Sequence, residues 1–118
     1  MHELEKVIGI AGTDITIEVR IATPKGKAVY DLSAKFGARP EAAAALLKEA
    51  QVRGCRTALA FHVGSQCLDP DAFRVAMEMA MKVAGEAGTP LEYLDVGGGF
   101  PALYKTNVPP LQDYFDVI

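Results

Sequence analysis

The sequence predicts an α/β fold in which parallel strands alternate with helices. Three observations support this fold class. Short runs of β-branched or apolar residues recur at 15–21, 57–63 and 91–96, and helix-forming segments separate these runs. The middle run is apolar on both faces, which is typical of a strand buried inside a parallel sheet. The order strand, helix, strand, helix, strand and start of a helix therefore gives about three βα units in a layer or a barrel.

The composition is that of an ordinary globular chain and disfavours several other classes. The 118 residues are 50% hydrophobic and 23% charged, with a net charge of −3 and no basic run, so a nucleic-acid partner is not expected. No apolar run reaches the roughly 20 residues that span a bilayer, and the N-terminus lacks the features of a signal peptide, so we expect no membrane association. Two cysteines, Cys55 and Cys67, are too few for a disulfide scaffold, which favours a cytoplasmic location.

The first strand is expected at 15–21, where Ile and Val alternate with Thr, Glu and Arg. A helix is expected at 39–53, because Pro40 suits a first helical turn and strong helix formers follow it. Gly54 then suits the end of that helix. Before the first strand, apolar residues have the spacing of a helix face: Leu4, Val7 and Ile8.

The second half repeats the pattern. A strand is expected at 57–63 and a helix at about 70–87, with Asp69-Pro70-Asp71 at its start and Gly88 at its end. The next strand is expected at 91–96, and a further helix begins after Pro109-Pro110. One face of the 70–87 helix carries apolar residues that we interpret as a core face rather than a cofactor contact: Phe73, Met77, Ala80, Met81 and Ala84.

Two segments follow predicted strands, at the edge of a parallel sheet where active sites lie. These are Phe-His-Val-Gly-Ser-Gln-Cys at 61–67 and Leu-Asp-Val-Gly-Gly-Gly-Phe-Pro at 94–101. A glycine triplet lets backbone N–H groups approach an anion without interference from a Cβ, and Ser65 could add a hydroxyl donor. The pattern favours a phosphate ligand, although glycine triplets also occur in ordinary tight turns. It does not match the dinucleotide fingerprint, because Ala102 stands at the position of the last glycine.

Together the two segments resemble the group IV pyridoxal-phosphate-dependent amino-acid decarboxylases, and most closely their ornithine/lysine decarboxylase branch. Arg20-Ile21-Ala22-Thr23 and Lys35-Phe36-Gly37-Ala38 occur in that family in the same order and at similar spacing. The resemblance implies a partial TIM-type (β/α)8 barrel of the alanine-racemase-like PLP fold. Residues 1–118 would be part of the N-terminal PLP-binding barrel domain, since a complete barrel takes about 250 residues.

The resemblance also implies the site and its cofactor, pyridoxal 5'-phosphate. His62 would be the catalytic histidine that stacks on the pyridine face, although a lone histidine at a strand end is more often a core residue. Arg20 would line the cofactor pocket, and an ordinary surface ion pair is almost as probable for it. Lys35 is interpreted as a structural or interface lysine and Cys67 as a buried, inert thiol. No metal site is expected. The phosphate-binding residues would be Ser65, Gly97, Gly98 and Gly99.

The function that the resemblance implies is decarboxylation of ornithine or lysine to a diamine and CO2 in polyamine biosynthesis, by a homodimer. The sequence leaves ornithine, lysine and arginine open as substrates. The family's Schiff-base lysine, its Glu-Pro-Gly-Arg segment and its C-terminal β domain do not occur within these residues, so the 118-residue chain alone is expected to be inactive. Two alternatives remain: a non-catalytic relative that acts as a regulator, and a phosphate-ligand binding protein.

Overall fold

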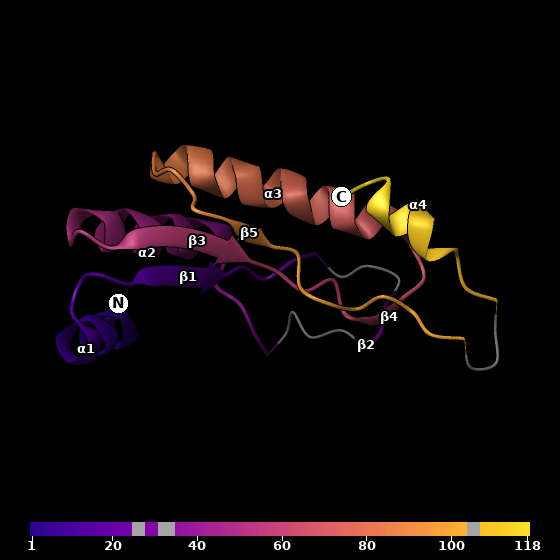
Figure 1. Cartoon of the computed structure of the whole chain (residues 1–118), viewed down its shortest axis with the longest axis horizontal. Coiled ribbons are helices and arrows are strands. Elements are labelled where there is room, and N and C mark those ends of the chain that lie inside the picture. Colours follow the sequence, from indigo (N-terminus) through magenta and orange to yellow (C-terminus); the bar gives the residue numbers. More distant parts are fainter. Residues whose placement is uncertain (25–27, 31–34, 104–106) are drawn as a thin grey trace.

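A computed structural model describes residues 1–24, 28–30, 35–103 and 107–118 (Figure 1). The elements in chain order are α1 (His2–Ala11), β1 (Thr16–Arg20), β2 (Ala28–Tyr30), α2 (Pro40–Val52), β3 (Arg56–Ala60), β4 (Ser65–Cys67), α3 (Asp71–Ala87), β5 (Leu94–Asp95) and α4 (Leu111–Phe115). The predicted alternation of strands and helices is confirmed.

The main sheet is parallel, with the strand order β1-β3-β5. The connecting helices α2 and α3 pack against each other and share one apolar core with the sheet. A doubly wound sheet carries its helices on both faces, whereas a barrel carries consecutive helices on the same outer face. The contact between α2 and α3 therefore fits the expected partial barrel. In Figure 1 the strands run toward the loops on the right, where their carboxyl ends meet.

The two faces of this sheet follow from the period of two along each strand. Val19 pairs with Leu59, which in turn pairs with Leu94, and this row packs into the core with α2 and α3. One residue further along, Arg20 pairs with Ala60, which pairs with Asp95, so this row lies on the opposite face. In a barrel that face is the interior.

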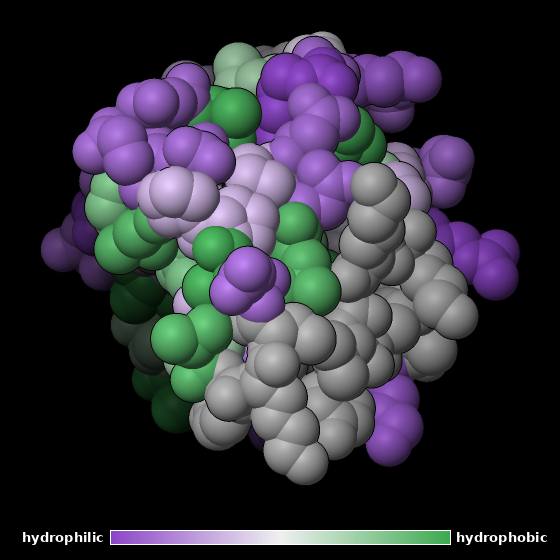
Figure 2. Space-filling model, turned by 90° about the vertical axis from the view of Figure 1, so that its right-hand side faces the viewer, coloured by the Kyte–Doolittle hydropathy of each residue, from purple (hydrophilic) through white to green (hydrophobic). Residues whose placement is uncertain are grey.

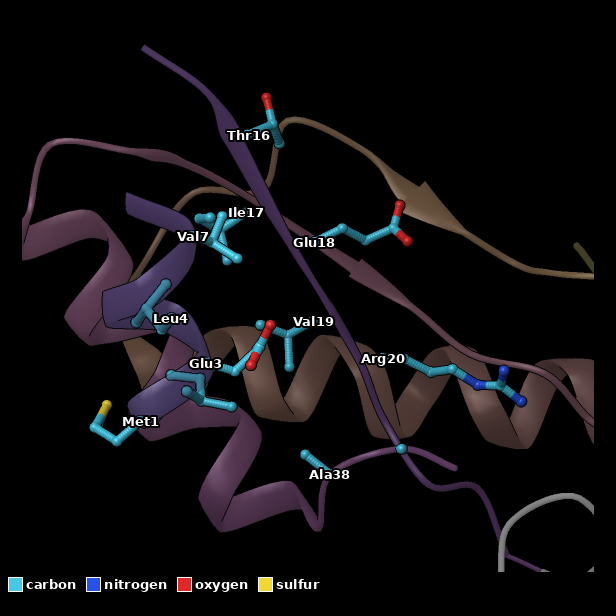
Figure 3. A pocket seen from close by; sticks show the side chains of 12 residues that line it. Met1, Glu3, Leu4, Val7, Thr16, Ile17, Glu18, Val19, Arg20 and Ala38 are labelled. Atoms are coloured by element: carbon cyan, nitrogen blue, oxygen red, sulfur yellow. The ribbon is translucent and has the colours of Figure 1, made fainter. Parts of the chain in front are cut away.

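A second, smaller core holds α1 against the sheet. It consists of Leu4 of α1, Ala50 of α2 and Cys55, so the predicted N-terminal helix is confirmed. Between α1 and β1 lies a hollow of about 740 Å³ (Figure 3). Apolar groups make up most of its wall, and Val19 and Ala38 are among them.

An additional ladder of two short strands was not expected from the sequence. β2 and β4 pair antiparallel, with Ala28 opposite Cys67 and Tyr30 opposite Ser65, beyond the carboxyl ends of the main strands. Three-residue strands show no measurable alternation, so the sequence pattern could not reveal them.

Several predicted boundaries change. The strand expected at 57–63 ends at Ala60, and the one expected at 91–96 is paired only at Leu94–Asp95. The expectation for Met81 was wrong, because its side chain is 61% exposed. The buried row of α3 runs through Ala76 and Val83, and Met81 lies well to one side of it. Among the described helices, none is both long and apolar enough to cross a membrane.

Candidate functional site

The two segments singled out in the sequence lie side by side beyond the carboxyl end of the sheet. The N–H of Phe61 donates to the carbonyl of Asp95 at 3.0 Å, and the N–H of Cys67 donates to the carbonyl of Gly99 at 2.8 Å. Because both ends of the 61–67 segment are bonded to the 95–99 segment, the two motifs form one continuous structure. This arrangement follows from the parallel pairing of β3 and β5, which ends both strands at the same edge.

The three glycines have different surroundings. Gly97 and Gly99 have φ values of +67° and +110°, and a Cβ on either would collide with a backbone oxygen, that of Phe61 or of Gly64. These two positions therefore require glycine so that the two segments can pack backbone against backbone. A methyl group on Gly98 would instead lie 3.6 Å from Nε2 of His62, an ordinary contact. Gly98 thus faces the imidazole.

The glycine turn leaves two backbone donors for a ligand. The N–H of Gly97 already donates to Oδ1 of Asp95 at 2.7 Å. No acceptor among the described residues is bonded to the N–H of Gly98 or Gly99, and the half-buried Ser65 hydroxyl likewise has no partner there. Adjacent N–H groups in a glycine turn form a concave anion site. A phosphate group fits this donor set, which consists of two N–H groups and one hydroxyl.

His62 is held as a neutral imidazole. Its Nδ1 accepts a hydrogen bond from the N–H of Gly64 at 3.0 Å, so the ring proton is on Nε2, which is the nitrogen nearest Gly98. Burial lowers the pKa of His62, the positive charge of Arg20 lowers it further, and Asp95 raises it in part. A proton on Nδ1 would also break the bond from Gly64. The ring is therefore uncharged at neutral pH, with a fixed orientation.

Arg20 lies on the interior face of the sheet, level with Asp95. Its guanidinium carbon is 5.3 Å from the centre of the Phe36 ring, a distance typical of a cation–π contact. Figure 3 shows its side chain extending away from α1. Within the part of the chain that the structure describes, Arg20 forms no salt bridge, so the surface ion pair considered for it is not found.

Lys35 and Cys67, which we interpret as non-catalytic, differ in their surroundings. Lys35 is exposed. Cys67 is fully buried, its Sγ donates to the carbonyl of Asp69 at 3.4 Å, and burial raises the pKa of its thiol. A thiol in that environment is a poor nucleophile. No cluster of three or more potential metal ligands occurs among the described residues.

The residues that anchor the site to α3 and α4 were not predicted as part of it from the sequence. Tyr114 is fully buried and its hydroxyl donates to the carbonyl of Cys67 at 2.7 Å. Phe100, which follows the glycine turn, stacks on Phe73 with ring centres 4.9 Å apart and meets Tyr114 edge to face. α4 therefore anchors the site through an aromatic cluster. The aromatic residues near Pro109-Pro110 were the available signal, but nothing local connects them to a strand end more than 40 residues earlier.

A parallel sheet with two unbonded N–H groups in a glycine turn and an imidazole at its carboxyl edge has the features of a site for a phosphorylated ligand. Comparison with known proteins makes this specific. Residues 1–118 match the pyridoxal binding domain of the pyridoxal-dependent decarboxylases. The chain belongs to this family.

Individual relatives agree with the family match. The lysine/ornithine decarboxylase of Selenomonas ruminantium is 43% identical over 104 residues, which cover 84% of this chain and 26% of that protein. The ornithine decarboxylase of Mus musculus is 39% identical over 111 residues, which cover 82% of this chain and 24% of that protein. The structure of lysine/ornithine decarboxylase from Vibrio vulnificus complexed with putrescine aligns with a TM-score of 0.78 at 33% identity, covering 99% of this chain and 31% of that one. The chain thus spans about a quarter of the length of the curated relatives it matches.

Proposed function

We propose that the complete protein that carries this chain is a pyridoxal-phosphate-dependent decarboxylase that converts ornithine or lysine to a diamine and CO2 in polyamine biosynthesis. One observation carries the proposal: the neutral ring of His62 lies beside two available N–H groups, at Gly98 and Gly99, in a chain of the pyridoxal-dependent decarboxylase family. The relatives from Selenomonas ruminantium and Vibrio vulnificus are both lysine/ornithine decarboxylases, which supports these two substrates.

The residues present would hold the cofactor by its phosphate. The N–H groups of Gly98 and Gly99 and the hydroxyl of Ser65 are the donors available for it. Gly97 contributes to the turn rather than to the ligand, because its N–H is already bonded to Asp95. When bound, pyridoxal phosphate supplies the electron sink that accepts the electron pair left by CO2.

His62 would orient the cofactor ring. Its imidazole is flat and uncharged, and the bond from the Gly64 N–H to Nδ1 opposes rotation of the ring. An aromatic ligand beside it gains stacking contact in one orientation. The lowered pKa of His62 keeps its ring uncharged at neutral pH.

Arg20 would line the same pocket from β1. Arg20 lies on the interior face of the sheet, and after burial its positive charge is the second cause that lowers the pKa of His62. Phe36 fixes the position of the guanidinium through the cation–π contact. Arg20 thus provides a fixed positive charge at the edge of the site, suited to an anionic group of cofactor or substrate.

A cytoplasmic homodimer is part of the proposal. The carboxyl end of the sheet exposes large apolar side chains, among them Leu103, Leu111 and Phe115, and Figure 2 shows apolar side chains gathered on this face. An apolar surface beside a site is suited to further protein covering it. Both cysteines are free thiols, which agrees with a reducing compartment.

The test is an activity assay on the complete protein loaded with pyridoxal phosphate. Ornithine, lysine and arginine are supplied separately, and the released CO2 and the amine product are measured. The proposal expects a diamine from ornithine or lysine. Cofactor binding without turnover of any of the three amino acids would overturn the enzymatic function and leave a non-catalytic binding protein.

A further inference from the structure

We propose that Gln66 is a positioning residue for phosphate binding, because its side chain clamps the end of the glycine turn. The proposal rests on the function proposed above and adds a residue that does not itself touch the ligand. The Gln66 side chain would help to fix the direction in which the N–H groups of Gly98 and Gly99 point.

The clamp is a pair of reciprocal hydrogen bonds. Nε2 of Gln66 donates to the carbonyl of Ala102 at 3.0 Å, and Oε1 accepts from the N–H of Ala102 at 2.8 Å. The side-chain amide therefore pairs with the Ala102 backbone as a neighbouring strand would. Both polar ends of the amide are used, so a side chain that offers only one of them would lose half of the interaction.

The backbone of Gln66 is held in an unfavourable conformation. Its φ of +55° makes it the one non-glycine residue with positive φ among the residues the structure describes. Such a conformation persists in a non-glycine residue only when the surroundings enforce it, and strain of this kind gathers at functional sites. Here it coincides with the clamp on Ala102.

The clamp completes a set of anchors on both sides of the free donors. Before them, the N–H of Gly97 is bonded to Asp95. After them, the carbonyl of Gly99 accepts from Cys67, and Gln66 holds Ala102. The N–H groups of Gly98 and Gly99 lie between these fixed points. Donors that are already fixed bind an anion without a further entropic cost of ordering.

The test compares two ligands that differ only in the phosphate group. Apo forms of the complete protein are titrated with pyridoxal phosphate and with pyridoxal, and the dissociation constant of each is measured. In Gln66→Gly the amide is removed while the backbone accepts positive φ freely. We expect about tenfold weaker binding of pyridoxal phosphate, corresponding to two lost hydrogen bonds, with unchanged binding of pyridoxal.

Two further variants sharpen the comparison. Gln66→Met keeps a side chain of similar length but offers Ala102 neither the donor nor the acceptor, so it should lose pyridoxal phosphate affinity to about the same degree as Gln66→Gly. It also serves as the test if Gln66→Gly does not fold. Gln51→Ala, at the exposed end of α2, is the matched control and should bind both ligands like the unmodified protein.

The outcomes separate this inference from the function on which it rests. If the unmodified protein does not prefer pyridoxal phosphate to pyridoxal, the phosphate site itself is wrong. If it has that preference and the Gln66 variants keep it in full, or weaken both ligands equally, Gln66 is a general structural residue and the positioning role is overturned.

Discussion

The two faces of the β1-β3-β5 sheet differ in chemistry although the same strands form both. The outer face carries Val19, Leu59 and Leu94 in register, and these pack against α2 and α3. The inner face carries Arg20 and Asp95 on either side of the small residue Ala60. The outer face excludes water and stabilises the layer, while the inner face leaves charged groups at the end where His62 and the glycine turn lie. Fold and site are thus separated by a single residue step along each strand.

Truncating a buried side chain that packs against the outer face should give the largest loss of unfolding free energy. Phe73 is fully buried and contacts Phe61, Phe100 and Tyr114. In the complete protein, Phe73→Ala should lower the free energy of unfolding by about 3–5 kcal/mol, because it leaves a cavity under the site. Urea unfolding measures this. Lys82→Ala, on the same helix and with a 78% exposed side chain, should change it by less than about 0.5 kcal/mol. Equal effects would mean that the aromatic cluster is not a core.

Substitutions of residues on the inner face should lower the catalytic rate more than they lower the free energy of unfolding. His62→Ala should lower kcat of the complete decarboxylase about a hundredfold, as expected when a reacting group loses its orientation. Cofactor affinity should fall much less, because the phosphate donors remain. Steady-state kinetics at saturating cofactor give kcat. His2→Ala, in the exposed N-terminal helix, is the control. A His62→Ala enzyme with unchanged kcat would remove this residue from the site.

The glycine turn allows the same substitution to be compared at adjacent positions. Gly99→Ala places a Cβ against the Gly64 carbonyl at a φ of +110° and should cost at least about 1–3 kcal/mol of unfolding free energy. Gly98→Ala meets only Nε2 of His62 at 3.6 Å and should be close to neutral for stability. Thermal or urea unfolding of both variants tests this. If Gly98→Ala were the more damaging change, the assignment of which glycine packs and which faces the site would be reversed.

The smallest expected effect is on titration. Arg20 lowers the pKa of His62, so Arg20→Gln should raise that pKa toward the ordinary value of about 6.5. The pKa of His62 is lower in the folded state than in the unfolded state. Between these two pKa values the unfolded state binds more protons, so the contribution of His62 to folding stability decreases as the pH falls through this range. Arg20→Gln should narrow the pH range between the folded-state and unfolded-state pKa values of His62. NMR titration of the histidine signal that disappears in His62→Gln measures the shift. A pKa that stays constant or falls would show that Arg20 does not face His62.

Local sequence signals predicted most of the outer face, although they wrongly placed Met81 in it. Pro40 and Gly88 start and end helices as expected, and Gly88 adopts the left-handed conformation that ends α3. The apolar run at 57–63 correctly indicated a buried central strand. These features depend on the spacing of residues within one element, which the sequence displays directly.

The two segments of the candidate site could be identified from the sequence, but their hydrogen bonds could not. Its two segments were identified, yet the donation of the Gly97 N–H to Asp95 and the clamp of Gln66 on Ala102 were not. Each depends on backbone geometry at φ values that the residue type does not dictate. Gln66 gave no signal at all, since glutamine rarely adopts positive φ. The sequence also does not distinguish the two roles within the glycine triplet. Gly97 and Gly99 pack against backbone, whereas Gly98 faces His62.

The central claim is that the phosphate of the cofactor binds to the N–H groups of Gly98 and Gly99 and not to that of Gly97. A crystal structure of the complete protein with pyridoxal phosphate measures this directly. We expect phosphate oxygens within about 2.7–3.2 Å of the Gly98 and Gly99 nitrogens, while the Gly97 N–H stays bonded to Asp95. A phosphate bonded to the Gly97 nitrogen, with Asp95 displaced, or bound away from this turn would contradict it.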